Sequence, residues 1–261
     1  MSTDSIELRR CHDIEDLRAC VRLQKEVWNF TDAELVPLRM FVVADKVGGQ
    51  VMGAFEKGAM VGFALSVPGT RSGHIYLHSH MLAVRVSHRN RGLGAQLKWE
   101  QRREALSRGI RHMEWTFDPL EIKNAFLNIH RLGATASQYL VDFYGVSSSR
   151  LQGGLPTDRL LAEWKLDSPR VQASFDGRPV AEYVIEERIL VPASIEQRKA
   201  NALDRERALA VQLENRQKFQ QAFARGLAVL GFARDEEENG VFELGTHTQT
   251  ELEAEPKEQK K

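Results

Sequence analysis

The sequence is poor in cysteine, carries no net charge and contains no long apolar run. Cys11 and Cys20 are the only cysteines among 261 residues. Both lie in or beside the first predicted helix, which favours inert thiols in a reducing compartment over a disulfide. Lys plus Arg equals Asp plus Glu at 36 each, so no overall charge attracts nucleic acid or a membrane surface. No apolar run approaches the roughly 20 residues that span a bilayer, and residues 1–10 lack the apolar core of a signal peptide. We therefore expect a cytoplasmic protein without a nucleic-acid or membrane partner.

The eight histidines are never spaced with cysteine or carboxylate in the way that zinc ligands are, so no metal site is expected. Hydrophobic residues make up 42% of the chain and charged residues 28%, which is ordinary for a globular protein. At this length the chain can form one large domain or two small ones. The most informative feature is local, and it lies between residues 78 and 95.

Residues 78–95 read HSHMLAVRVSHRNRGLGA and predict a strand, a glycine turn and the start of a helix. Two-residue alternation places Tyr76, His78, His80 and Leu82 on one face of the strand. In the turn, glycines let a ligand approach the backbone, while free helix N–H groups and the helix dipole favour negative charge. This order indicates a phosphate site; a solvated basic helix cap is the alternative.

The turn fits neither of two familiar phosphate loops. The dinucleotide fingerprint needs a glycine or alanine where Leu97 stands, and the Walker loop needs Gly-Lys-Ser/Thr, which is absent. The pattern Arg89-x-x-Gly92-x-Gly94 instead resembles the pyrophosphate loop of the GNAT N-acyltransferase superfamily, whose co-substrate is acetyl-CoA or another acyl-CoA. The residues that the resemblance implies at the coenzyme are Leu82, Ala83, Val84, Arg89, Asn90, Arg91, Gly92, Leu93, Gly94, Ala95 and Asn124. For Asn124 a helix cap is the alternative.

The order of predicted elements is also similar to the GNAT fold. That fold is α/β (α+β), with a mixed, mostly antiparallel sheet, splayed central strands that hold the pantetheine arm, and flanking helices. The expected strands are 6–10, 50–58, 60–69, 76–84, 112–120, 139–144, 155–166 and 180–191, and the expected helices are 14–28, 38–48, 95–109, 124–132 and 194–226. A hairpin is expected over 232–244. We expect a catalytic domain over 1–166, a helical and hairpin extension packed on it over 167–245, and a disordered tail over 246–261.

The resemblance also implies where a base would lie. Many relatives have a Glu on the fourth strand a few residues before the loop, and that position here holds His80, with His78 two residues earlier. Histidine has an ordinary pKa of about 6.5, which suits a base near neutrality. The alternative is that one or both histidines only form hydrogen bonds within the sheet.

The usual proton donor to the departing thiolate is a Tyr in the helix after the fifth strand, but that place holds Ile129. Tyr144 is the candidate that remains, beside Tyr139, and either could equally be a half-buried strand residue. Transfer without a dedicated acid is a further alternative, because a thiolate is a good leaving group.

For the acceptor, the fold implies wall residues from the first two helices and the ends of the splayed strands. The candidates are Trp28, Arg39, Arg71 and Trp115. An arginine such as Arg71 could clamp a carboxylate on the acceptor or on a succinyl donor; the alternative is a solvated loop charge.

A longer resemblance, from Trp115 to Trp164, is to a GNAT branch of which some members are linked to N-succinylamino acid metabolism. We therefore predict a coenzyme A-dependent N-acyltransferase that acts on the amine of a small molecule such as an amino acid. Acetyl is the default acyl group and succinyl the alternative. A catalytically silent acyl-CoA-binding module and a protein or peptide N-acetyltransferase are the alternative functions, and a homodimer is one open oligomeric state.

Overall fold

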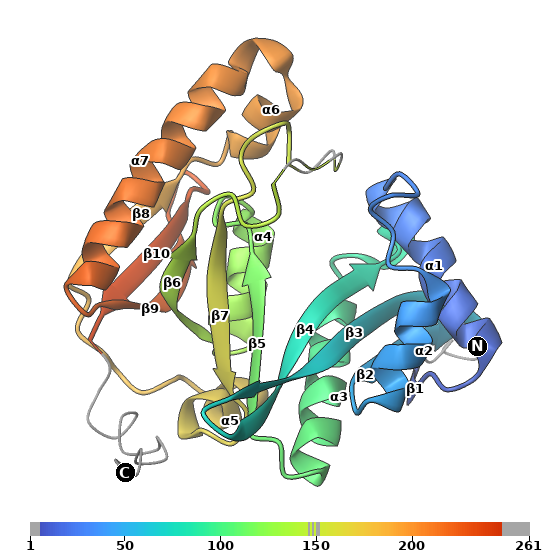
Figure 1. Cartoon of the computed structure of the whole chain (residues 1–261). Coiled ribbons are helices and arrows are strands. Elements are labelled where there is room, and N and C mark those ends of the chain that lie inside the picture. Colours follow the sequence, from blue (N-terminus) through green and yellow to red (C-terminus); the bar gives the residue numbers. More distant parts are fainter. Residues whose placement is uncertain (1–5, 146, 148, 150–151, 247–261) are drawn as a thin grey trace, which may run out of the picture. The chain divides into compact units, whose positions relative to one another are not determined.

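The structure is a computed structural model that describes residues 6–145, 147, 149 and 152–246 (Figure 1). The chain divides into two units, which are described separately. Unit 1 comprises residues 1–115 and 146–154, and unit 2 comprises residues 116–145 and 155–261. The strand β5 (His112–Phe117) begins in unit 1 and ends in unit 2.

The sheet of unit 1 has the strand order β1-β2-β3-β4-β5. Its strands before β5 are β1 (Glu7–Arg10), β2 (Gln50–Glu56), β3 (Ala59–Arg71) and β4 (His74–Val84). These four pair antiparallel, and β5 pairs parallel with β4. Lys57 and Gly58 form the turn between β2 and β3 with φ angles of 50° and 77°, the left-handed values that a tight hairpin turn needs. The predicted mixed, mostly antiparallel sheet is confirmed.

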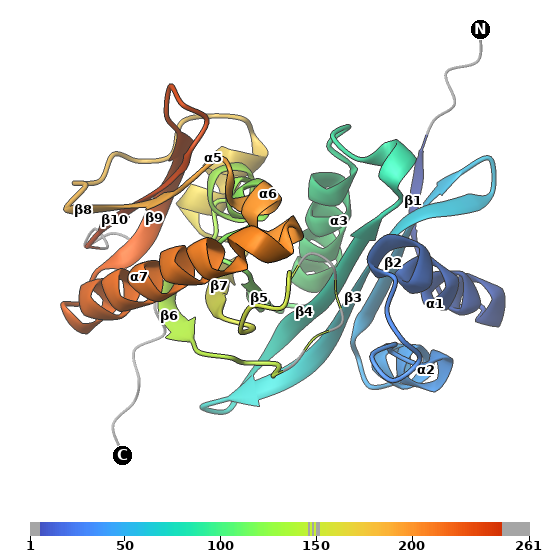
Figure 2. The ribbon, with the colours of Figure 1, turned by 90° about the horizontal axis from the view of Figure 1, so that it is seen from above.

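Helices cover both faces of this sheet (Figure 2). Helix α1 (Ile14–Trp28) begins after Asp13, whose side chain accepts a hydrogen bond from the N–H of Asp16. Together with α2 (Leu38–Lys46), it buries one face of the sheet through a cluster that includes Leu17, Phe41, Phe63, Leu65, Met81 and Ala83. Helix α3 (Leu93–Ser107) covers the other face, where its Leu93 and Leu97 pack on Met52, Ala54 and Ala64.

The sheet of unit 2 has the strand order β7-β6-β9-β10-β8. Its strands are β6 (Thr135–Leu140), β7 (Arg159–Lys165), β8 (Glu187–Val191), β9 (Ala228–Arg234) and β10 (Gly240–Gly245). Its helices are α4 (Ile122–Ala125), a π-helical turn over Phe126–Arg131, α5 (Pro169–Phe175), α6 (Ile195–Ala200), a 3₁₀ turn over Ala202–Asp204, and α7 (Arg205–Ala224). Strand β9 pairs with β6. The strands of the expected extension therefore continue the sheet of β6 and β7.

Helix α7 is held on this sheet by aromatic packing and by one buried carboxylate. The ring of Phe219 stacks on Tyr139 and meets Phe242 edge-on, at centroid distances of 5.6 and 5.2 Å. Asp158 is fully buried and accepts hydrogen bonds from Arg216 of α7 at 2.8 and 3.0 Å and from the hydroxyl of Tyr139 at 2.7 Å. Burial and this carboxylate raise the pKa of Tyr139 above its ordinary value. Tyr139 is therefore part of the packing of α7.

Several predicted boundaries are wrong. The segment 139–144 is not a strand, because β6 ends at Leu140 and a turn with Asp142 at φ 44° follows. The helix expected from Asn124 begins at Ile122 and continues as a π-helical turn, so Asn124 is not its cap. The strand expected over 180–191 begins only at Glu187, and the helix expected to reach residue 226 ends at Ala224. Helix α5 has no counterpart among the expected elements. The expected tail, except Thr246, lies outside the described residues.

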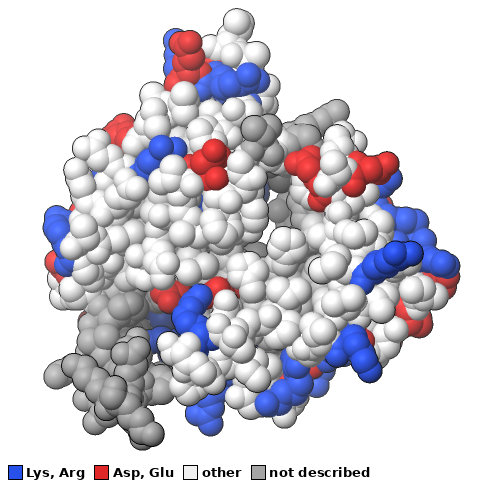
Figure 3. Space-filling view, in the orientation of Figure 1, with Lys and Arg blue, Asp and Glu red and all other residues white. Residues whose placement is uncertain are grey.

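Charged side chains occur in small separate groups on the face of the molecule shown in Figure 3, with both signs present. Within the described residues, no helix is both long and apolar enough to cross a bilayer.

Candidate active site

A bulge in β4 determines where its histidines point. Leu65 of β3 pairs with Met81 and Ser66 pairs with Ser79, so His80 is the extra residue in β4. The bulge reverses the alternation of the strand, because each added residue shifts the pleat by one position. The predicted common face of His78, His80 and Leu82 is therefore wrong.

His78 lies on the face that α1 and α2 cover. It pairs with Val67, which packs on the core cluster beneath those helices. Leu82, beyond the bulge, packs instead on the cluster beneath α3. His80 is exposed at the bulge itself, with its ring 6.5 Å from that of His78 between centroids. The surrounding protein penalises the charged form of His80, and together with the neighbouring His78 it lowers the pKa of His80 below its ordinary value. His80 is thus neutral at pH 7.

The pairing of β4 with β5 is short. Within the described residues it comprises Leu77 with Met113 and His78 with Glu114, although β4 continues to Val84 and β5 to Phe117. This short pairing agrees with the splayed central strands that the sequence predicts. The role of Leu82, Ala83 and Val84 at the coenzyme stays a prediction.

Glu114, which was not among the predicted site residues, lies at the point where this pairing ends. Its side chain is 5% exposed, and Nη1 of Arg71 lies 2.9 Å from its Oε2. Nδ1 of His78 lies 3.5 Å from Oε1, and Nε2 of His112 lies 3.9 Å from Oε2. Burial alone would raise the pKa of Glu114, but these histidines and Arg71 outweigh it and hold the pKa well below its ordinary value. Glu114 is therefore charged at neutral pH.

A glycine turn after β4 leads into α3. His88 is buried and joins the start of this turn to β2 through Nε2, 3.1 Å from Glu56. Arg89 donates from Nε to the carbonyl of Val84 at 3.1 Å. Gly92 is the N-cap of α3 with φ 76°, and no side chain caps the helix. A Cβ built on Gly92 would meet no atom within 4 Å, so the space before the helix is open.

These features fit a pyrophosphate. The first intrahelical bond joins the N–H of Gln96 to the carbonyl of Gly92, so the N–H groups of Leu93, Gly94 and Ala95 have no helical partner. Such groups, with the positive end of the helix dipole, bind anions. The side chains of Arg89, Asn90 and Arg91 are exposed beside them. The structure thus places the predicted coenzyme residues of β4, the turn and α3 in one continuous segment.

The predicted acceptor residues of unit 1 lie apart from one another. Trp28 stacks on Phe30 at 5.4 Å and is partly buried in the core beneath α1. Arg39 is exposed on α2. Trp115 is buried on the α3 side, where Nζ of Lys98 lies 3.4 Å from its ring centroid. Arg71 alone contacts the Glu114 cluster, with its guanidinium 4.9 Å from the ring of Tyr76.

Two predicted residues belong to unit 2. The hydroxyl of Tyr144 lies 2.8 Å from Oγ1 of Thr116, and its backbone N–H donates to Thr157. Its side chain is exposed. Asn124 is exposed in α4. Among the described residues, no group of three or more His, Cys, Asp or Glu is arranged to hold a metal ion.

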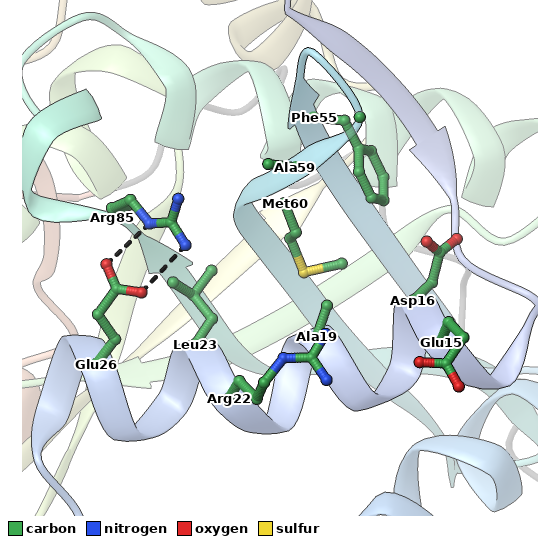
Figure 4. A pocket seen from close by; sticks show the side chains of 11 residues that line it. Glu15, Asp16, Ala19, Arg22, Leu23, Glu26, Phe55, Ala59, Met60 and Arg85 are labelled. Atoms are coloured by element: carbon green, nitrogen blue, oxygen red, sulfur yellow. Dashed lines mark hydrogen bonds and ion pairs between the residues drawn. The ribbon is translucent and has the colours of Figure 1, made fainter.

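A separate hollow of about 300 Å³ lies between α1 and the β2–β3 hairpin (Figure 4). Phe55 and Met60 form its apolar side, and the ion pair of Glu26 with Arg85 closes one end at 2.8 Å. Asp16 on its rim is already paired with Arg9. The hollow therefore contributes none of the residues predicted to be functional.

The chain thus combines a bulged strand, a glycine turn and a helix N-terminus without a side-chain cap. Residues 12–128 match the family model described as the acetyltransferase (GNAT) family. This match spans less than half of the chain, so this part of the chain is similar to the acetyltransferases of that family. No curated protein matches the chain by sequence.

Several solved structures have a similar fold. A putative acetyltransferase from Salmonella typhimurium, solved with its cofactor acetyl-CoA, has 19% identity and a TM-score of 0.51 over 63% of this chain and 95% of its own. The ribosomal-protein-S18-alanine N-acetyltransferase from Escherichia coli has 14% identity and a TM-score of 0.50 over 63% and 96%. An N-acetyltransferase from Staphylococcus aureus Mu50 has 18% identity and a TM-score of 0.50 over 62% and 99%. At these identities the likeness concerns the fold.

Proposed function

We propose that the protein acylates the primary amine of a small molecule of the amino-acid class, with His78 as the base. One observation carries the proposal. His78 stands where the pairing of β4 and β5 ends, on the face covered by α1 and α2, with Nδ1 directed toward the buried carboxylate of Glu114. Its Nε2 has no hydrogen-bond partner among the described residues and is thus available to accept a proton.

The proposed acyl transfer needs a bound acyl donor and a base that deprotonates the acceptor amine. Acyl-coenzyme A, held by the turn and by the first N–H groups of α3, supplies the thioester. His78 takes a proton from the acceptor's ammonium group, which frees the nitrogen lone pair for attack on the carbonyl carbon. The C–N bond forms as the C–S bond breaks; the sulfur leaves with its electron pair and takes up a proton as the amide nitrogen loses its second one. His80, neutral and adjacent, is the second candidate for the base.

The acceptor class is supported by the resemblance of residues 115–164 to enzymes linked with N-succinylamino acids. The structure from Escherichia coli named above is an N-acetyltransferase of a protein alanine. A free amino acid and a peptide N-terminus both present a primary α-amine, so a direct comparison of the two is needed. Acetyl is the proposed acyl group, and succinyl is its competitor.

Thiol release tests the proposal. Acetyl-CoA and succinyl-CoA would each be offered with L- and D-amino acids, polyamines and a peptide with a free N-terminus. We expect turnover with acetyl-CoA and one class of free amino acid, and a loss of more than 100-fold in kcat for His78→Ala but not for His80→Ala. Turnover only with the peptide would overturn the acceptor assignment. Full activity of His78→Ala would overturn the assignment of the base.

A further inference from the structure

The carboxylate of Glu114 is buried beside two histidines and one arginine, more partners than a simple ion pair contains. It is 5% exposed, and its strongest partner, Arg71, is 52% exposed. Burying a carboxylate against a half-solvated arginine is unfavourable unless further donors satisfy it. The rings of His78 and His112 face it at 3.5 and 3.9 Å, and its Oε2 is buried without a hydrogen-bond partner among the described residues. Glu114 thus joins a proposed catalytic group to the tip of the β3–β4 hairpin, where Arg71 lies.

Glu114 also controls which ring nitrogen of His78 carries the proton. A carboxylate can only accept, so it favours the tautomer of His78 with the proton on Nδ1, 3.5 Å away, which leaves Nε2 with its lone pair. The ring of His78 is 23% exposed and therefore open to a small acceptor. A carboxylate that fixes a histidine tautomer and stabilises the imidazolium is a recurrent device in acid–base chemistry.

We infer that Glu114 is the positioning residue of the acyl transfer: it orients His78, fixes its tautomer and stabilises its protonated form, while Arg71 moderates the charge of Glu114. This inference rests on the proposed function, in which His78 is the base. Glu114 of β5 and His80 of β4 face the ring of His78. Arg71 of β3 and His112 of β5 face Glu114 in turn, and Tyr76 of β4 lies beside both. From α1 and α2, the residues packed on this face belong to the apolar core cluster.

Two substitutions have opposite expected effects on the pH profile. Glu114→Gln keeps an oxygen that can accept from Nδ1 but removes the negative charge. The protonated base then loses the facing negative charge, so the acid limb of kcat/KM should move toward lower pH, with kcat about 10-fold lower. Arg71→Met leaves Glu114 without its cation, so the same limb should move toward higher pH. If Glu114 and Arg71 had only structural roles, the two substitutions would move the acid limb in the same direction or leave it in place.

A double-substitution cycle separates this inference from the proposed function. We expect Glu114→Gln to lower kcat in the wild-type background and to have no further effect in His78→Ala, while KM for acetyl-CoA stays unchanged. An equal loss in both backgrounds would overturn the positioning role and leave His78 as base. Full activity of His78→Ala would instead refute the proposed function. Because Glu114→Gln can also destabilise the fold, thermal unfolding of each variant is measured, and Glu114→Asp should recover part of the rate.

Discussion

Ser79, the neighbour of the bulged residue in β4, donates a hydrogen bond of 3.0 Å to Oε1 of Gln101 in α3. Both side chains are buried, and the backbone carbonyl of Gln101 accepts a further bond from Gln50 of β2. Ser66, which pairs with Ser79 across the bulge, donates to the same Gln50. The bulge is thus fixed from behind by a buried polar network, and each residue of that network should matter for stability.

Ser79→Ala should lower the free energy of unfolding by about 1–2 kcal/mol, because it leaves a buried amide oxygen without its donor. Urea unfolding at pH 7 measures this. Ser107→Ala is the matched control, since the Ser107 hydroxyl is exposed and donates only to a helix carbonyl; its effect should stay within about 0.5 kcal/mol. Equal effects of the two substitutions would show that the network does not support the bulge.

Gly92→Leu should weaken acetyl-CoA binding at least 10-fold, because a side chain at the N-cap of α3 occupies the approach to the free N–H groups. Gly58→Leu is the control: Gly58 has φ 77° and an equally open surrounding, so both variants carry the same strain of about 1–2 kcal/mol. Calorimetric titration with the coenzyme gives the comparison. If both variants kept wild-type affinity, the phosphate would have to bind elsewhere.

Lys199→Met should destabilise unit 2 by about 3–5 kcal/mol at pH 7, because it leaves two facing carboxylates buried without their cation. Lys199 is 3% exposed and lies 2.9 Å from Asp118 and 2.7 Å from Glu121. These carboxylates raise the pKa of Lys199 despite its burial. The stabilisation by Lys199 is therefore complete below the ordinary pKa of lysine and is lost only at strongly alkaline pH.

The loss in Lys199→Met should shrink as the pH falls below about 5, since the stranded carboxylates can then take up protons. Burial already raises the pKa of Glu121. Denaturant midpoints at pH 7 and pH 4.5 would show this, with the exposed pair of Lys218 and Glu214 as reference. Lys218→Met should change stability by no more than about 0.5 kcal/mol. A pH-independent loss would contradict the account given for Lys199.

Tyr144→Phe tests the acid that the sequence proposes: if Tyr144 protonates the departing thiolate, kcat falls about 10-fold and KM for acetyl-CoA stays unchanged. The control is Tyr183→Phe, which removes a hydroxyl of unit 2 that is bonded to Glu243. That variant should keep its turnover. Wild-type kcat in Tyr144→Phe would show that the thiolate leaves without a dedicated acid.

The sequence predicted the order of strand, glycine turn and helix around residues 89–95, because the glycine positions mark the turn. It did not predict the bulge at His80, since alternation assumes an unbroken register. The prediction that His78 shares a face of the strand with Tyr76 is therefore correct, and the prediction that it shares that face with Leu82 is wrong. A bulge depends on the pairing with β3 and on Gln101, which is far away in sequence.

Glu114 could have been noticed, because a charged residue between Met113 and Trp115 in an apolar strand predicts a buried carboxylate with a partner. Its partners, however, come from the far end of a hairpin and from the neighbouring strand, and no local pattern identifies them. Helix α5 carried a signal that was not used. Ser168 caps it through the N–H of Val171 and Pro169 follows at its first position, which is a typical helix start.

The pairing of β9 with β6 limits how the gene can be shortened. A chain ending after Leu166 would lack β8, β9 and β10, and β6 would become an edge strand with unpaired N–H and C=O groups. Such an edge favours pairing with another molecule, so the truncated product should aggregate even though it retains the complete acyl-CoA segment. Expression of residues 1–166 alone is therefore a poor route to a well-behaved protein.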